Sequence, residues 1–232
     1  MVLSRVCVPT IRTAFVKSKA RNCMRYTIEM KELISPEIRK TLVDSIFPDL
    51  KNGRKDFDLP HTIAVVYWME QILEAVESPD LDPLVMIPAA FAHDWGYVGL
   101  FEGVNSNDTA VIKTRKADHM KVGAEKLDQL ILNKLWRDIS LHQRRDAVHL
   151  VRVHDKVEEL STEPELTIME ADTLGMLDSN RVAPTFSKEQ NDNFMATDIE
   201  KRRVPRFVHE FSKEKARELK EVRKAWYTNK NS

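Results

Sequence analysis

The sequence predicts an all-α protein, a compact helical bundle. Apolar residues recur at helical spacing through most of the chain, and two capping boxes precede such stretches. We find no segment with the alternating pattern of a strand, and no internal repeat. Of the 232 residues, 42% are hydrophobic and 31% are charged, so a sizeable packed core is expected.

The charge balance argues against two classes of partner. Basic and acidic residues number 36 each, which leaves no electrostatic footprint for nucleic acid or an anionic membrane surface. No apolar run approaches the roughly 18 residues of a membrane span.

Cys7 and Cys23 are isolated, as in a reducing compartment without disulfides. We therefore expect a cytoplasmic protein.

The first 25 residues are basic and carry no acid before Glu29. An organelle transit segment is one interpretation, although the apolar stretch of a secretory signal is missing. A basic extension or surface helix is the interpretation we favour. Residues 27–47 follow as one or two short helices, interrupted near Pro36.

Two helices with aspartate–proline starts are expected next. Asp58 caps the first, with Pro60 in its first turn, and His61 begins the buried face of a helix that reaches about Val76. Asp82 and the proline after it start a central helix that is apolar nearly all round. Pro88 should kink that helix or mark its true start. His93-Asp94 lies at its C-terminal end, and Gly96 is expected to stop it.

Three further helices carry polar residues on apolar stripes. After a loop at 98–109, a helix to about Asn133 has His119 on its inner stripe, and Gly123 there allows close approach of another helix. A capping box at 140–143 starts a helix that places His154 beside Leu150 and Val151. A second box at 162–165 starts a helix that carries Asp172 on an apolar stripe.

The C-terminal part is expected to be more polar. Residues 184–193 form a connector, and two helices follow near 194–202 and 206–227. Their charges alternate in sign, which is typical of a solvated face. We divide the chain into a basic extension with short helices (1–50), a metal-binding helical core (51–182) and C-terminal helices (183–232).

Six residues in these helices point to a metal centre: His61, His93, Asp94, His119, His154 and Asp172. Taken singly, a histidine on an apolar stripe is more often a core residue, and an aspartate at a helix end is more often a cap. Several imidazoles and carboxylates directed into one helical interior cannot all be paired cheaply. A cation neutralises the carboxylates and satisfies the imidazoles together.

The order of these residues resembles the signature of the HD-domain superfamily of metal-dependent phosphohydrolases. The segment at 89–96 is similar to its "AALLHDIG" motif, the segment at 119–127 to the "HxxxGAxxL" of two-metal members, and the segment at 170–174 to "DADxL". The segment from Asp58 to Thr62 resembles the part with the first histidine. The resemblance covers roughly residues 55–180 and implies a bundle of the HD-domain type.

The resemblance implies a ligand set as well. His61, His93, Asp94 and Asp172 would hold a first ion, with His93 and Asp94 as catalytic residues. Asp94 would bridge to a second ion that takes His119 and His154. His149 is the rival to His154, and we prefer His154 because His149 lies between two arginines on a wetter face. The cofactor would be one or two divalent ions, drawn from Mn, Fe, Mg, Ni, Co or Zn.

One departure bears on the second ion. Two-metal relatives often carry a His-His pair where this chain has His154-Asp155. This difference weakens the expectation of a second ion, and Asp155 could instead hydrogen-bond a ligand imidazole or orient water.

The expected activity is hydrolysis of a nucleotide or another small phosphate ester by metal-activated water. Four basic residues near the ligands are candidates for binding phosphate oxygens, although an ordinary basic helix surface explains them as well: Lys113, Arg115, Lys116 and Arg152. The same six ligands also resemble those of the mixed-valent di-iron oxygenases of the superfamily. A non-catalytic module that keeps the metal as a structural or sensing element is the third hypothesis.

Overall fold

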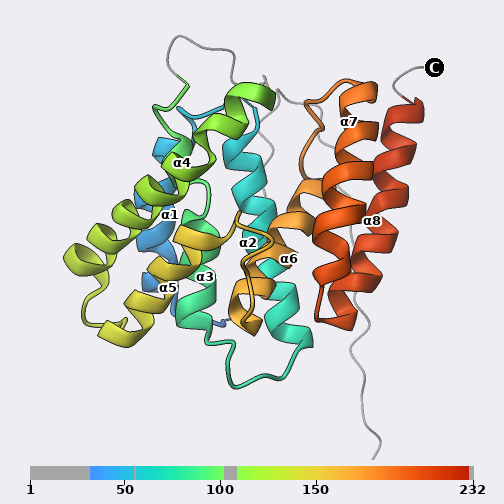
Figure 1. Ribbon diagram of the computed structural model, residues 1–232. Coiled ribbons are helices and arrows are strands. Elements are labelled where there is room, and N and C mark those ends of the chain that lie inside the picture. Colours follow the sequence, from blue (N-terminus) through green and yellow to red (C-terminus); the bar gives the residue numbers. More distant parts are fainter. Residues whose placement is uncertain (1–31, 55, 102–108, 230–232) are drawn as a thin grey trace, which may run out of the picture. The chain divides into compact units, whose positions relative to one another are not determined.

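The computed structural model describes residues 32–54, 56–101 and 109–229, apart from the side chains of residues 109, 110 and 113. Within the unit that begins at Lys31, these residues form helices and no strand, which confirms the predicted all-α class (Figure 1). The helices are α1 (Pro36–Leu50), α2 (Asp58–Ala75), α3 (Pro83–Ala92), α4 (Thr109–Leu130), α5 (Leu141–Val153), α6 (Glu163–Leu177), α7 (Lys188–Phe194) and α8 (Glu210–Asn229).

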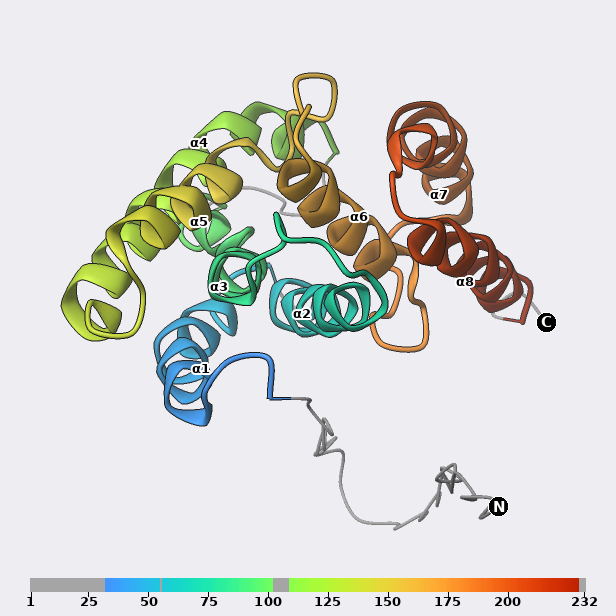
Figure 2. The same ribbon diagram turned by 90° about the horizontal axis from the view of Figure 1, so that it is seen from below.

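Helix α3 is the central element, as its uniformly apolar sequence predicts. Every residue from Val85 to Ala92 is buried. Figure 2 shows α3 nearly end-on, with α1, α2 and α5 arranged around it. A short 3₁₀ turn, η1 (Trp95–Tyr97), follows and packs against α4. The residues just after α3 are therefore held in the interior of the bundle.

The remaining helices form pairs around this centre. Helix α2 lies along α6, α4 lies along α5, and α8 lies against the other side of α6 (Figures 1 and 2). Helix α7 continues into a π-helical stretch, η3 (Met195–Arg203), which also contacts α6. A 3₁₀ turn, η4 (Val204–Arg206), leads toward α8. The C-terminal helices thus cover a face of α6, the helix that carries Asp172.

Several helix boundaries were predicted correctly. The side chain of Asp82 accepts a hydrogen bond from the Leu84 N–H at 2.8 Å, and α3 begins at Pro83 and passes through Pro88. Ser140 and Thr162 both start complete capping boxes, so α5 and α6 begin where expected. Helix α4 ends at Leu130 and continues as a π-helical turn, η2 (Ile131–Leu135).

Three local predictions were wrong. Pro36 does not interrupt a helix but is the first residue of α1, where a proline loses no hydrogen bond. Asp58 is not a cap, because its carboxylate accepts from the backbone and side chain of Arg54 instead of the start of α2. The segment 184–193 is not merely a connector, because α7 begins at Lys188. The solvated face predicted for the last helix is confirmed, since none of its alternating charges at 213–221 is buried.

Other features of the sequence lie outside the described residues. These include Cys7, Cys23 and the basic first 25 positions. Within the described part of the chain, no helix combines the length and the apolar character needed to cross a membrane.

Candidate metal centre

The structure brings all six predicted ligands to one buried place. His61 comes from the first turn of α2, His93 and Asp94 directly follow α3, and His119 lies in α4. His154 directly follows α5, and Asp172 lies in α6. None of the six is more than 7% exposed. Five helices therefore supply nitrogen and oxygen donors to a shared interior.

The first group of donors surrounds one oxygen of Asp94. His61 Nε2 lies 3.1 Å from Asp172 Oδ1 and 3.3 Å from His93 Nε2. Asp94 Oδ2 lies 3.6 Å from His93 Nε2 and 3.8 Å from His61 Nε2. Donor atoms of His61, His93 and Asp94 lie close enough together to hold one ion, and Asp172 lies beside them through its contact with His61.

The second group surrounds the other oxygen of the same carboxylate. Asp94 Oδ1 lies 3.5 Å from His119 Nε2 and 3.7 Å from His154 Nε2, and these two nitrogens are 3.3 Å apart. These donors could also hold an ion. Asp94 therefore stands between two sets of imidazoles, with one oxygen turned to each.

Hydrogen bonds on the far side of two rings fix which nitrogen is free. His93 Nδ1 donates to the Ala90 carbonyl at 2.8 Å, and His154 Nδ1 donates to the Val151 carbonyl at 2.9 Å. In the neutral tautomer this assigns, each Nε2 directs a lone pair toward Asp94. Lone pairs facing a carboxylate repel it, unless a cation or a proton lies between them. The donor set therefore fits a divalent ion.

Aromatic rings hold the other two imidazoles. Phe57 stacks on His61 with centroids 5.0 Å apart, and Tyr97 stacks on His119 at 3.9 Å and nearly parallel. The Nδ1 atoms of His61 and His119 are buried and have no hydrogen-bond partner among the described residues. These two rings are thus positioned by stacking, whereas His93 and His154 are positioned by carbonyl groups.

The surroundings favour ionised carboxylates and mostly neutral imidazoles. Burial acts to raise the pKa of Asp94, but His93, His154 and Arg54 hold that pKa well below its usual range. Burial lowers the pKa of His119 to about 4 and also lowers that of His93. Burial opposes the charged form of His154 as well, yet Asp94 raises its pKa overall. A bound metal ion would take the place of the proton on His154.

Helix α4 packs closely on η1, beside the residues that follow α3. A Cβ atom on Gly96 would lie 1.9 Å from the His119 carbonyl oxygen, and one on Gly123 would lie 3.1 Å from the Ala92 carbonyl oxygen. The prediction that Gly123 permits close approach is confirmed. Gly96 is not a helix stop as predicted, because α3 ends at Ala92 and Gly96 is the point of contact with α4.

Arg54 is a site residue that sequence reasoning missed. Its Nη2 lies 3.2 Å from Asp94 Oδ2, and its Nε lies 2.6 Å from Asp58 Oδ1. The guanidinium also lies 4.6 Å from the centre of the Phe57 ring and 4.4 Å from that of Tyr97. Burial opposes its charge, but Asp58 and Asp94 raise the pKa of Arg54. The only available signal was a basic residue in a turn, which is common on any surface.

Arg203 is the second missed residue. Its Nη1 donates to Asp172 Oδ2 at 2.8 Å, its Nη2 to Asp155 Oδ1 at 2.7 Å, and its Nε to Asp198 Oδ2 at 3.0 Å. Burial opposes the charge, but these three carboxylates raise the pKa of Arg203. A signal did exist, because Ile199 lies four residues earlier and marks an inward face.

The network around the centre carries excess negative charge. Five carboxylates are present: Asp58, Asp94, Asp155, Asp172 and Asp198. Three cations pair with them: Arg54, Lys116 and Arg203. Arg202 and Glu158 extend the network by one charge of each sign. With neutral imidazoles two negative charges remain, which one divalent ion would balance.

A cavity of about 620 Å³ opens beside the donors, and only some of the predicted phosphate-binding residues line it. Lys116 lines it, and its Nζ lies 2.8 Å from Asp155 Oδ2. Arg115 and Arg152 do not line it, and the side chain of Lys113 lies outside the described part of the chain. His149 binds Glu165 near the protein surface instead of facing Asp94.

Comparison with known proteins identifies the family. The model of the HD domain family matches residues 59–177, about half of the chain. The chain is a member of the HD-domain family. Comparison with curated proteins and with solved structures gave no match. The matched segment of this HD domain begins just before His61 and ends just after Asp172, so it contains all six clustered residues. The superfamily includes metal-dependent phosphohydrolases, and HD domains bind divalent metals.

Proposed function

We propose that this HD-domain protein is a metal-dependent phosphohydrolase that acts on a nucleotide or another small phosphate ester. The observation that carries the proposal is the position of Asp94, whose two oxygens face two separate pairs of imidazoles. A carboxylate shared between two ion sites, beside a cavity whose lining includes cationic side chains as well as carboxylates, is the arrangement that two-metal phosphate hydrolysis uses.

The residues that would hold the ions follow from the two donor groups. His61, His93, Asp94 and Asp172 would bind the first ion, and Asp94, His119 and His154 would bind the second. Bound divalent ions polarise a phosphoryl oxygen and lower the pKa of water, which is the chemistry that phosphate-ester hydrolysis requires.

The protein side chains around this centre have positioning and charge-compensating roles. Arg54 holds Asp94 Oδ2 and Arg203 holds Asp172 Oδ2, so each carboxylate has a fixed orientation. Lys116 reaches the cavity from α4, with about a third of its side chain exposed. Its ammonium can donate to a phosphate oxygen while Asp155 balances its charge. In this chain Asp155 orients Lys116 and Arg203. Among the described residues, it forms no hydrogen bond with an imidazole.

A small-molecule substrate is part of the proposal. The cavity volume lies within the range of about 300–1,000 Å³ that is usual for small-ligand sites. The balanced charge of the chain gives no support for nucleic acid or a membrane surface as a partner. A cytoplasmic location is the compartment we propose.

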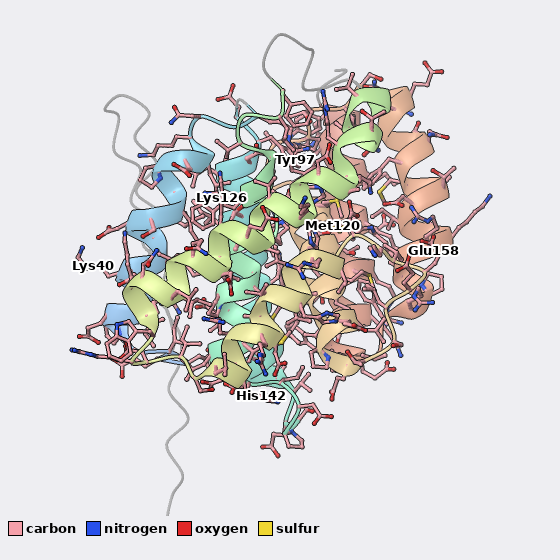
Figure 3. The ribbon with its side chains drawn as sticks, turned by 60° about the vertical axis from the view of Figure 1, so that its left-hand side comes forward. Lys40, Tyr97, Met120, Lys126, His142 and Glu158 are labelled. Carbon is pink, nitrogen blue, oxygen red and sulfur yellow. The ribbon has the colours of Figure 1, made fainter. Side chains whose placement is uncertain are left out.

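The test combines metal analysis with a substrate panel. Protein purified without added metal is analysed for bound ions, then assayed for phosphate or pyrophosphate release from nucleotides and phosphodiesters. We expect one or two divalent ions per chain and turnover that chelation abolishes. Asp94→Ala and His93→Ala should lose both metal and turnover. His142→Ala is the matched control, because His142 projects from the start of α5, where it pairs with Asp146 (Figure 3).

The outcomes separate the competing hypotheses. Wild-type turnover in a folded Asp94→Ala variant would refute the proposal. Bound iron with oxygen consumption and no phosphate release would identify the di-iron oxygenase chemistry instead. Bound metal that stabilises the fold, with no turnover on any substrate, would identify a non-catalytic metal-binding module.

A further inference from the structure

The cavity extends beyond the metal centre to the C-terminal helices. Besides Asp94, His154 and Asp172, its lining includes Phe186 and Phe194 near α7, and Arg223 of α8. Helices α7 and α8 lie next to α6 in both ribbon views (Figures 1 and 2). A ligand in this cavity would therefore contact both the family-matched segment and the helices that follow it.

Arg223 is a buried cation without a carboxylate partner among the described residues. It is 5% exposed, its Nε donates to Asn191 Oδ1 at 2.6 Å, and its Nη1 donates to the Met176 carbonyl at 2.6 Å. Both acceptors are neutral. The Nη2 group has no hydrogen-bond partner within the described part of the chain. Two other arginines of this cavity, Arg54 and Arg203, each pair with two or more carboxylates.

A structural role explains only part of this arrangement. The Met176 carbonyl is one of the last in α6, and arginine side chains often bind such carbonyl groups. The partial negative charge at that helix end offsets some of the positive charge of Arg223. The rings of Phe194 and Tyr227 also lie 5.9 Å from the guanidinium carbon, which is the outer limit of a cation–π contact. No carboxylate of the described residues balances the remaining charge, and burial lowers the pKa of Arg223, opposed only by Tyr227. Leaving a buried guanidinium unpaired is costly unless an anion can reach it.

The position of Arg223 gives the distance between the metal centre and the far end of the cavity. Met176 follows Asp172 by four residues on α6, so the carbonyl that Arg223 binds lies roughly 6 Å farther along the helix. Apolar side chains and amides line the cavity too, among them Met176, Phe194, Gln190 and Asn193. A single phosphate at the metal centre would leave these residues and Arg223 without a ligand.

We propose that Arg223 binds a second anionic group of the substrate, so that the substrate is an organic phosphate with a phosphate or carboxylate at the other end of a partly apolar body. The inference rests on the proposed function for the assignment of the hydrolysed end to the Asp94 centre. The shared chemistry at the far end is an oxyanion that accepts two hydrogen bonds from a guanidinium.

Calorimetric titration of the metal-loaded protein with non-hydrolysable ligands tests this without turnover. The ligands are propane- to octane-α,ω-bisphosphonates, ω-carboxyalkyl phosphonates of the same lengths, and ω-hydroxyalkyl phosphonates as single-anion controls. At the matching length, we expect the dianionic ligand to bind about 10- to 100-fold more tightly than the hydroxy control. The bisphosphonate and carboxylate arms then identify which second anion is preferred.

Two variants assign the effect to Arg223. Arg223→Gln should lose the advantage of the second anion and keep wild-type affinity for the hydroxyalkyl phosphonate, whereas Arg223→Lys should keep part of the advantage. Arg202→Gln is the matched control, since Arg202 also lines the cavity but is neutralised by Glu158 and Asp198. Figure 3 shows Glu158 beside the C-terminal helices. That variant should bind both ligand types as the wild type does.

The results also separate this inference from the proposed function. If the hydroxyalkyl phosphonate binds but no second anion improves affinity at any length, the role of Arg223 is refuted and the hydrolase proposal stands. An undiminished advantage in folded Arg223→Gln refutes it equally. If dianionic ligands bind more tightly than the hydroxyalkyl phosphonates but no ester is hydrolysed, the anion-binding role of Arg223 stands and the hydrolase proposal is refuted.

Discussion

Arg203 binds the oxygen of Asp172 that is turned away from the histidines. Its Nη1 lies 2.8 Å from Oδ2, while Oδ1 of the same carboxylate lies 3.1 Å from His61 Nε2. One residue of the C-terminal helices thus fixes the orientation of a carboxylate in the family-matched segment. The arginine takes one lone-pair side of Asp172 and leaves the other for the candidate ion.

Replacing Arg203 should therefore weaken metal binding more than it changes the fold. We expect Arg203→Gln to lower metal affinity about 10- to 100-fold, because a partner that orients a ligand is lost. Competition with a chelating dye measures the affinity, and circular dichroism checks the fold. Arg202→Gln, one position earlier, should bind metal normally. Unchanged affinity in a folded Arg203→Gln protein would contradict a positioning role.

Removing the metal should destabilise the protein. Without an ion, negative charge that the arginines and Lys116 do not balance stays buried at the centre. Saturation at a hundredfold excess over Kd adds about 2.7 kcal/mol to the free energy of unfolding. For a chain of this size, that corresponds to an increase in Tm of roughly 5–10 °C. Thermal unfolding with and without a chelator measures it, and Asp94→Ala should show no shift.

Much of the site was predictable because its residues lie in regular helices with strong start signals. The capping boxes at Ser140 and Thr162 fix the starts of α5 and α6, and helical spacing then places His154 and Asp172. The packing that joins the helices is not local in sequence. Gly96 therefore seemed to be a helix stop, although its role is to let η1 touch the backbone of α4.

Helical periodicity could place Arg203 and Arg223 on inward faces, but it could not predict the ion pair between Asp198 and Arg203. Asp198 and Arg203 pair although they are five residues apart, because η3 is a π-helix, and a wheel drawn at 3.6 residues per turn separates them. Helical periodicity alone was enough to identify Arg223. It lies on a stripe with Ala216, Leu219 and Tyr227, all buried, so an arginine on an apolar face was visible in the sequence.

The contact at Gly96 gives a further prediction. A Cβ there would meet the His119 carbonyl oxygen at 1.9 Å and the Gly123 backbone nitrogen at 2.6 Å, and backbone atoms cannot move aside as a side chain can. Gly96→Ala should therefore cost about 3 kcal/mol of stability, the upper end for overpacking. Urea unfolding measures it.

Gly99→Ala is the matched control for that variant. Gly99 has φ +87° but no atom within 4 Å of an added Cβ, so its cost should be only about 1 kcal/mol of backbone strain. Equal destabilisation by the two substitutions would show that close packing of η1 on α4 is not what Gly96 provides.

Glu165 gives the protein a pH-dependent contribution to stability that is separate from the metal centre. Its carboxylate accepts from the backbone N–H groups of Ser161 and Thr162 and from His149 Nε2, at 2.8, 3.0 and 2.7 Å. Burial opposes ionisation, but these hydrogen bonds lower the pKa of Glu165 to about 2, from 4.5. A depressed folded-state pKa stabilises the fold above the unfolded value, and the stabilisation is lost as the pH falls through the folded one.

We therefore expect Glu165→Ala to reduce the free energy of unfolding by about 1–2 kcal/mol at neutral pH, the usual cost of losing a helix cap. The difference from wild type should shrink as the pH falls from about 4.5 toward about 2, because the wild-type carboxylate is then protonated too. Denaturant unfolding across this range measures it. Glu159→Ala is the control, since Glu159 is an exposed partner of Lys156 and its removal should change little at any pH. A deficit in Glu165→Ala that stays constant down to pH about 2 would mean that the charge of the carboxylate contributes nothing and that only the packing of its methylene groups does.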